Sequence, residues 1–114
     1  REFEKIEGEI MFDYMINNTD PKLVVFELDV YWVMKGGYNA VDYMKKYPAR
    51  IPVLHIKDEH EIGASGTIDF KPIFETAYAT KVKEFYVEVE RYNFEPIESV
   101  RKSYEYLAAA PYVK

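Results

Sequence analysis

Three apolar segments of the chain end in polar side chains at alternate positions. They are Leu23–Asp29, Ile51–Lys57 and Lys83–Glu90, and each is rich in β-branched and aromatic residues. Near-continuous apolar runs of this length are typical of strands that are buried on both faces of a parallel sheet. Segments with helical signals separate and follow them. The pattern therefore predicts a β-α-β-α-β-α arrangement, in which helices cover parallel strands.

The helices are predicted from apolar spacing of 3.6 residues and from capping residues. We expect them over Met11–Ile16, over Asn39–Lys46, from an Asp69 cap to about Thr80, and over Ile97–Ala109. Pro96 is expected to open the last helix, whose apolar stripe would consist of Val100, Tyr104 and Leu107. Glycine pairs predict loops over Val30–Gly37 and over Asp58–Thr67, the second containing Gly63 and Gly66.

Composition limits the class of protein. A 48% hydrophobic and 31% charged chain of 114 residues fits one globular unit without repeats or a linker. A net charge of −5 argues against nucleic-acid binding, and no apolar run is long enough to cross a membrane. The absence of cysteine excludes disulfides and thiolate chemistry. The chain starts at Arg1 without Met, which we interpret as a cut, so the compartment is open, with the cytoplasm favoured over the periplasm.

The polar residues at the strand ends are the candidates for chemistry. Three i, i+2 pairs, Glu27/Asp29, His55/Lys57 and Glu88/Glu90, each share one face of a strand. Burying so many ionisable groups without partners would be costly, so a functional role is indicated. If the strands lie side by side, then Asp29, His55 and Glu88 converge and form a ligand set for a divalent metal ion.

The spacing of these candidates favours one kind of parallel fold. Asp29 and His55 are 26 residues apart, and His55 and Glu88 are 33 apart, about one βα unit each. Polar groups at successive strand carboxyl ends build the active site of a (β/α)8 barrel, which needs roughly 250 residues. The expected fold class is therefore α/β, with residues 1–114 as a single partial domain: about strands six to eight of a TIM barrel with their helices.

Several motifs, above all Phe26–Trp32, Leu54–Asp58 and Val87–Arg91, resemble the sugar phosphate isomerase/epimerase family of xylose-isomerase-like TIM barrels. The resemblance covers nearly the whole chain and corresponds to the C-terminal half of the barrel. Its motifs are Phe26–Trp32, Leu54–Asp58, Glu61–Gly63, Gly66–Phe70, Val87–Arg91 and the last helix around Ser103–Leu107. It implies that Asp29, His55 and Glu88 hold one divalent ion (Mn, Mg or Zn), with a further ligand upstream of Arg1.

Two departures bear on the substrate. Trp32 stands where sugar epimerases and the related abasic-site endonucleases carry a histidine, and His55 and His60 are too few for the multi-zinc site of those endonucleases. His55-Ile56-Lys57-Asp58 instead resembles the motif of inosose dehydratases and 3-keto-sugar lyases. Both a sugar isomerase/epimerase and this lyase alternative therefore stay open.

The expected mechanism is metal-assisted proton transfer through a cis-enediolate. Glu88, or a carboxylate outside this chain, would be the general base, and Lys57 would donate to the developing oxyanion. The substrate is expected to be a small sugar, contacted by Trp32, Lys57, Glu90 and Arg91. Whether Trp32 and Tyr31 stack on a sugar or simply pack stays open, and Glu90 is expected to pair with Lys57 or Arg91.

A non-catalytic sugar-binding barrel and an inactive fragment are the other classes that the residues allow. Metal content separates the first from an enzyme. A sheet of three strands would expose its barrel-facing residues Leu23, Val25, Val53 and Tyr86. We therefore expect the chain to associate with a second copy or to belong to a longer chain.

Overall fold

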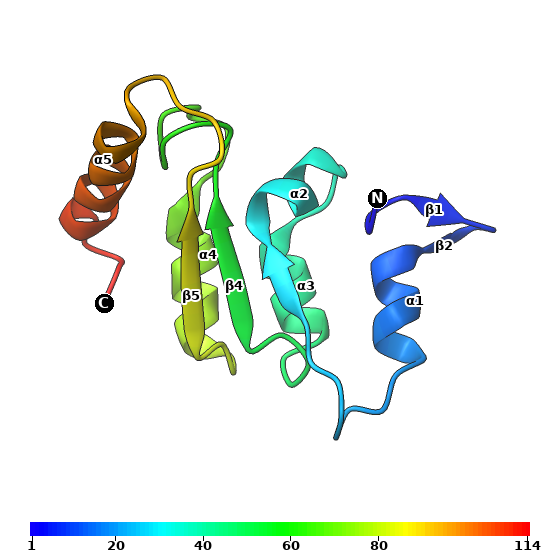
Figure 1. The fold of residues 1–114 in the computed structure, drawn as a ribbon. Coiled ribbons are helices and arrows are strands. Elements are labelled where there is room, and N and C mark those ends of the chain that lie inside the picture. The colour runs from blue at the N-terminus through cyan, green and yellow to red at the C-terminus, as the bar shows by residue number, and fades with distance from the viewer.

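Three parallel strands form the centre of the structure, a computed structural model that describes residues 1–114 (Figure 1). They are β3 (Glu27–Asp29), β4 (Val53–Lys57) and β5 (Glu84–Glu88), in the spatial order β3-β4-β5. Asp29 pairs with His55, and Lys57 pairs with Glu88. The predicted α/β class with parallel strands is confirmed, and all three strands end at the same edge of the sheet.

Five helices and a short hairpin accompany the sheet. The bounds are α1 (Met11–Asn17), α2 (Val30–Lys35), α3 (Ala40–Lys46), α4 (Phe70–Ala79) and α5 (Pro96–Ala109), with the antiparallel hairpin β1 (Lys5–Ile6) and β2 (Glu9–Ile10) before α1. Figure 1 shows α3 and α4 behind the sheet and the opposite face uncovered. Four of these helices were predicted, and the Asp69 carboxylate accepts a hydrogen bond from the Lys71 N–H, as expected for a cap.

The segment after β3 corrects the sequence prediction, because the expected loop over Val30–Gly37 contains helix α2. The cause is Asp29, whose Oδ1 accepts the Trp32 N–H at 2.9 Å and caps the new helix. Only Gly36 and Gly37 after it are non-helical. The loop signal of the two glycines therefore marked the end of a helix, as glycine often does.

The first strand is also shorter than predicted. It begins at Glu27, which pairs with Val53, the first residue of β4, so no strand lies beside Leu23 or Val25. These two side chains are 82% and 55% exposed. The apolar run at 23–26 is therefore not a buried strand within residues 1–114.

Helix α5 presents a different face to the protein than its apolar stripe predicts. Leu107 is buried, but Val100 and Tyr104 are exposed, and Ser99 and Ser103 point inward instead. The Ser103 hydroxyl accepts the Ile62 N–H at 3.0 Å, and Gly63 leaves space for the ring of Tyr106. Polar contacts to the loop after β4 therefore set the orientation of this helix.

Side chains alternate between the two faces of the sheet. Leu28, Leu54 and Ile56 are fully buried against the helices. Asp29, His55 and Lys57 lie on the opposite, uncovered face, since they alternate with those residues. The hydrophobic core thus fixes which face carries the ionisable side chains.

We expect the 114-residue chain to self-associate, because apolar side chains on the uncovered face of the sheet and in the segment before β3 meet solvent. Leu23, Val25 and Tyr86 are exposed and Val53 is half-buried. Light scattering over a range of concentrations should show dimers or larger species. A stable monomer in which these four side chains are protected from solvent would contradict the expectation.

Candidate active site at the carboxyl edge of the sheet

Ionisable side chains from all three strands meet on the uncovered face of the sheet. The His55 ring lies between the two neighbouring strands: Nδ1 is 3.2 Å from Asp29 Oδ2, and Nε2 is 3.4 Å from Glu88 Oε2. Nδ1 also lies 3.4 Å from Glu27 Oε1. The structure therefore brings together the three residues that strand spacing selected, with the imidazole as the bridge between the carboxylates.

Asp29 is held in place by its own helix cap. One carboxylate oxygen accepts the Trp32 N–H while the other faces His55. Burial raises the pKa of Asp29 above its ordinary value, although the Trp32 hydrogen bond opposes that effect. The side chain is therefore both a structural cap and a member of the ionisable cluster.

Lys57 lies almost fully buried between two carboxylates. Its Nζ donates to Glu88 Oε2 at 2.7 Å and also to Glu90. Burial lowers the pKa of Lys57, but these two hydrogen bonds outweigh that effect and leave the pKa above its ordinary value. Lys57 is therefore a cation, and it fixes the position of Glu88 Oε2.

Glu90 and Arg91, which follow β5, make different contacts. Glu90 reaches Lys57 but not His55, so Glu88 is the carboxylate of this pair that belongs to the His55 cluster. The Lys57 hydrogen bond lowers the pKa of Glu90. Arg91 turns toward Glu59 instead, with its Nη1 3.9 Å from Glu59 Oε1.

Of the two aromatic residues after β3, only Trp32 is available to a ligand. Tyr31 is buried in the core, whereas Trp32 is 44% exposed and packs edge-on against it. The Lys57 ammonium lies 5.8 Å from the centre of the Trp32 ring. Trp32 therefore borders the ionisable cluster, and the buried Tyr31 ring packs against Trp32.

The chemistry of the donor set fits a divalent metal ion. Two carboxylates and one imidazole are ligands that Mg²⁺, Mn²⁺ and Zn²⁺ accept. In this structure the three groups contact one another in pairs through His55, and no group of three or more His, Asp or Glu side chains is arranged to hold an ion. Their arrangement here is a chain of close contacts with the imidazole in the middle.

Two buried carboxylates in the loop after β4 escaped the sequence analysis as functional groups. Glu61 accepts hydrogen bonds from the Asn93 backbone and side chain and from the Ser99 hydroxyl, at 2.6 to 2.9 Å. Asp58 accepts the N–H groups of Glu59 and Gly63. Glu61 thus ties the loop after β4 to the loop after β5. The family-like motif contained both residues, but only the fold shows that the carboxylates are buried.

Replacing Glu61 by glutamine is expected to destabilise the protein by about 1–3 kcal/mol at neutral pH, because the amide cannot accept from all three donors. Burial alone would raise the pKa of Glu61, but the hydrogen bonds from Asn93 and Ser99 have the larger effect and lower this pKa to about 2. Since the folded pKa lies below the unfolded one, the stabilisation is present above about pH 4.5 and is lost as the pH falls toward 2.

Urea unfolding at several pH values measures this effect. The variant should lose less stability than the unmodified chain between about pH 5 and 2. Glu59→Gln is the matched control, since the Glu59 side chain is 43% exposed and lies near only Arg91, at 3.9 Å. Equal pH dependence of the unmodified chain and of Glu61→Gln would contradict the assigned role.

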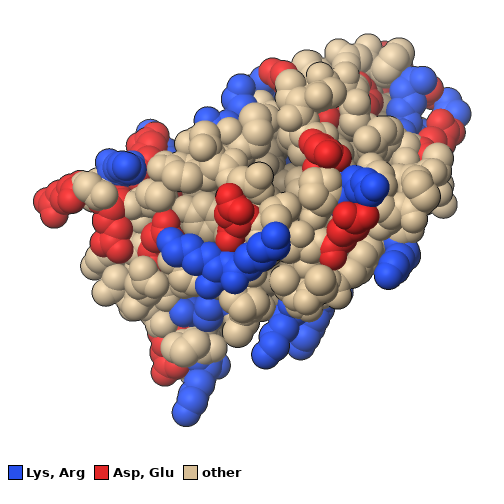
Figure 2. All heavy atoms as spheres, turned by 180° about the vertical axis from the view of Figure 1, so that it is seen from behind, with Lys and Arg blue, Asp and Glu red and all other residues tan.

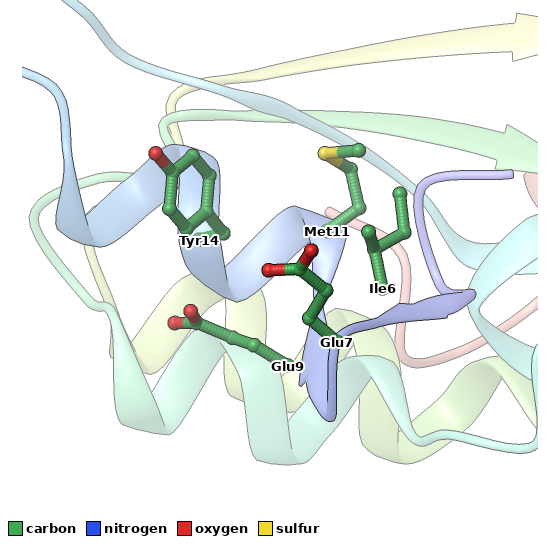
Figure 3. Close-up of a pocket in the computed structure, with 5 residues that line it drawn as sticks. All are labelled: Ile6, Glu7, Glu9, Met11 and Tyr14. Atoms are coloured by element: carbon green, nitrogen blue, oxygen red, sulfur yellow. The ribbon is translucent and has the colours of Figure 1, made fainter.

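A hollow of about 300 Å³ lies elsewhere, between the β1–β2 hairpin and α1 (Figure 3). It is lined by Ile6, Glu7, Glu9, Met11 and Tyr14. None of the strand-end residues contributes to it. Because the ionisable cluster is assembled at the sheet edge and not here, this hollow is not the candidate active site.

Comparison with solved structures gives strong matches, among them two crystal structures. Both are crystal structures of chains from Parabacteroides distasonis that are described as sugar phosphate isomerase/epimerase. One is 42% identical with a TM-score of 0.90 over 99% of this chain, and the other is 41% identical with a TM-score of 0.91 over its full length. This chain spans 40% of the length of each of them.

A chain that spans 40% of these relatives agrees with the partial TIM barrel expected from the sequence. No protein-family model and no curated protein matches the chain. No helix has both the length and the apolar character needed to cross a membrane.

Proposed function

The chain belongs to the sugar phosphate isomerase/epimerase family, and we propose that the protein containing it is a metal-dependent isomerase or epimerase of a small sugar or sugar phosphate. The observation that carries the proposal is the meeting of Asp29, His55 and Glu88 at one sheet edge. Carboxyl edges of parallel strands are where barrels of this kind perform chemistry. The descriptions of the relatives suggest the reaction class, and the carboxylates, the imidazole and Lys57 are the kinds of group that such a reaction uses.

Asp29, His55 and Glu88 would hold the divalent ion, together with a ligand from outside this chain. The chemistry that such an ion supplies is polarisation of the sugar carbonyl and its neighbouring hydroxyl, which acidifies the adjacent C–H bond. All further steps belong to protein side chains.

Glu88 is the proposed general base. Its Oε2 is the atom approached by both His55 and Lys57, which orients the carboxylate toward the uncovered face. The group would take a proton from the carbon beside the carbonyl and return it to the neighbouring carbon, or an acid from outside this chain would deliver a proton to the opposite face of the first carbon. The first outcome is isomerisation, and the second is epimerisation.

Lys57 is proposed to stabilise the enediolate that forms between these steps. Two of its three N–H donors serve Glu88 and Glu90, which leaves one for a developing oxyanion. Trp32, exposed beside it, is proposed to pack against the apolar face of the sugar. If the same enediolate lost a neighbouring substituent, the reaction would be that of a dehydratase or lyase.

The proposal is tested on the intact protein with a panel of aldoses and ketoses, before and after removal of metal by a chelator. Interconversion should disappear after chelation and return with added Mn²⁺, Mg²⁺ or Zn²⁺. Glu88→Gln should lower kcat by about 10²- to 10⁴-fold. Glu75→Gln is the control, because Glu75 lies on α4, which covers the opposite face of the sheet, and contacts none of the strand-end residues. Undiminished turnover in the chelated protein would refute the metal-dependent mechanism.

A further inference from the structure

The loops after β4 and β5 are the place where a barrel of this kind often binds a phosphate group. In TIM barrels a phosphate site frequently forms from the loops after the last two strands and the start of a helix. Such a site needs backbone N–H groups, hydroxyls or cations that are free to turn toward the anion. The corresponding donors of this chain lie in residues 58–69, in residues 89–95 and at the start of α5.

Internal carboxylates already occupy those donors. Glu61 takes the Asn93 N–H, the Asn93 side-chain amide and the Ser99 hydroxyl in the first turn of α5. Asp58 takes the Gly63 N–H, together with the hydroxyl of Ser65. Glu61 is ionised at neutral pH, since its pKa is about 2. A carboxylate that belongs to the protein thus occupies the donors with which these two loops could bind a phosphate.

The charges around the cluster also disfavour an anion. The only Lys or Arg in residues 58–69 and 89–95 is Arg91, and it lies beside Glu59. Two of the three Lys57 N–H donors are engaged by Glu88 and Glu90, and the third is the one proposed to bind the enediolate oxygen. The acidic residues at the carboxyl edge of the uncovered face and directly after it are Glu27, Asp29, Glu88 and Glu90.

This acidic excess is local. The opposite side of the molecule, where α3 and α4 cover the sheet, carries acidic and basic side chains interspersed (Figure 2). Even if a divalent ion offset Asp29 and Glu88, the remaining carboxylates would outnumber Lys57. A phosphate dianion brought to this edge would therefore be repelled, while a neutral sugar would lose nothing.

We propose that the substrate is an uncharged, unphosphorylated sugar, and that the phosphate position of the barrel is closed from within by Glu61. The inference rests on the proposed isomerase or epimerase function and narrows its substrate class. The hydroxyls of the sugar would be bound by the carboxylates of the open face, which are strong hydrogen-bond acceptors.

The test uses the intact, metal-loaded protein and a panel of ketoses, each paired with its terminal phosphate ester, for example D-fructose with D-fructose 6-phosphate. We expect kcat/KM to be about tenfold or more higher for the free ketose than for its ester. Equal or faster turnover of the esters would overturn the inference and leave the proposed function intact. No turnover of any pair would overturn the proposed function as well.

A second readout separates charge repulsion from a simple size limit. Repulsion is screened by salt, so the preference for the free ketose should shrink between about 0.01 M and 1 M ionic strength. Glu27→Gln, which removes one negative charge beside the cluster, should narrow the preference in the same direction. If neither higher ionic strength nor Glu27→Gln reduces the preference for the free ketose, charge does not cause that preference and the proposal is overturned.

Discussion

Replacing His55 by alanine in the intact protein is expected to lower turnover about 100-fold or more while leaving the fold in place. Mutating a group that only hydrogen-bonds to a metal ligand typically lowers metal affinity or activity by about 10- to 100-fold. His55 is itself a proposed ligand and lies directly between Asp29 and Glu88, so we expect a larger loss. The ring lies on the uncovered face of the sheet, so its loss removes little core packing. Turnover with added metal, together with a thermal unfolding curve, measures both effects.

His60→Ala is the matched control, since the chain contains only these two histidines. His60 lies in the loop after β4 and contacts none of the strand-end carboxylates within salt-bridge distance. Its replacement should leave turnover within about twofold. Full activity of the His55 variant after chelation and without added metal would rule out the proposed site.

The second large effect concerns stability. Replacing Leu54 by alanine should lower the free energy of unfolding by about 2–5 kcal/mol, because the side chain is fully buried on the central strand β4. Removing it leaves a cavity between the sheet and its covering helices. Urea unfolding of the 114-residue chain at one fixed protein concentration measures the change.

Leu23→Ala removes the same atoms from an exposed position, and it should change the free energy of unfolding by no more than about 0.5 kcal/mol. The comparison therefore isolates burial from residue type. Similar losses in the two variants would mean that residue 23 is covered in solution, as it would be in a dimer formed through this face. The concentration dependence of the midpoint then identifies that case.

The strand-end cluster could be predicted because strand periodicity and parallel pairing act over short distances. Once β3, β4 and β5 lie in register, Asp29 and His55 must be neighbours on one face. Strand periodicity does not choose between Glu88 and Glu90, because both lie on the same face, and the choice of Glu88 rests on the family-like motif. The structure places Glu88 3.4 Å from His55. Local pattern and topology were therefore sufficient for Asp29 and His55 but not for the third residue.

Other features depended on contacts between distant segments. The inward face of α5 is set by Ser103 and the Ile62 N–H, which are 41 residues apart, and no apolar spacing encodes that contact. The same holds for Glu61 and Ser99. Helix α2 was missed for a different reason: Asp29 was considered as a ligand and not also as a helix cap.

Glu88 is proposed to move a proton at the carbon beside the sugar carbonyl. The most direct test is turnover of a ketose by the intact, metal-loaded protein in D₂O, followed by NMR of the product. The proposed mechanism predicts that deuterium appears at the carbon that receives the proton, and that Glu88→Gln removes this incorporation together with turnover. A product formed at the same rate with no deuterium, as a direct hydride shift would give, would contradict it.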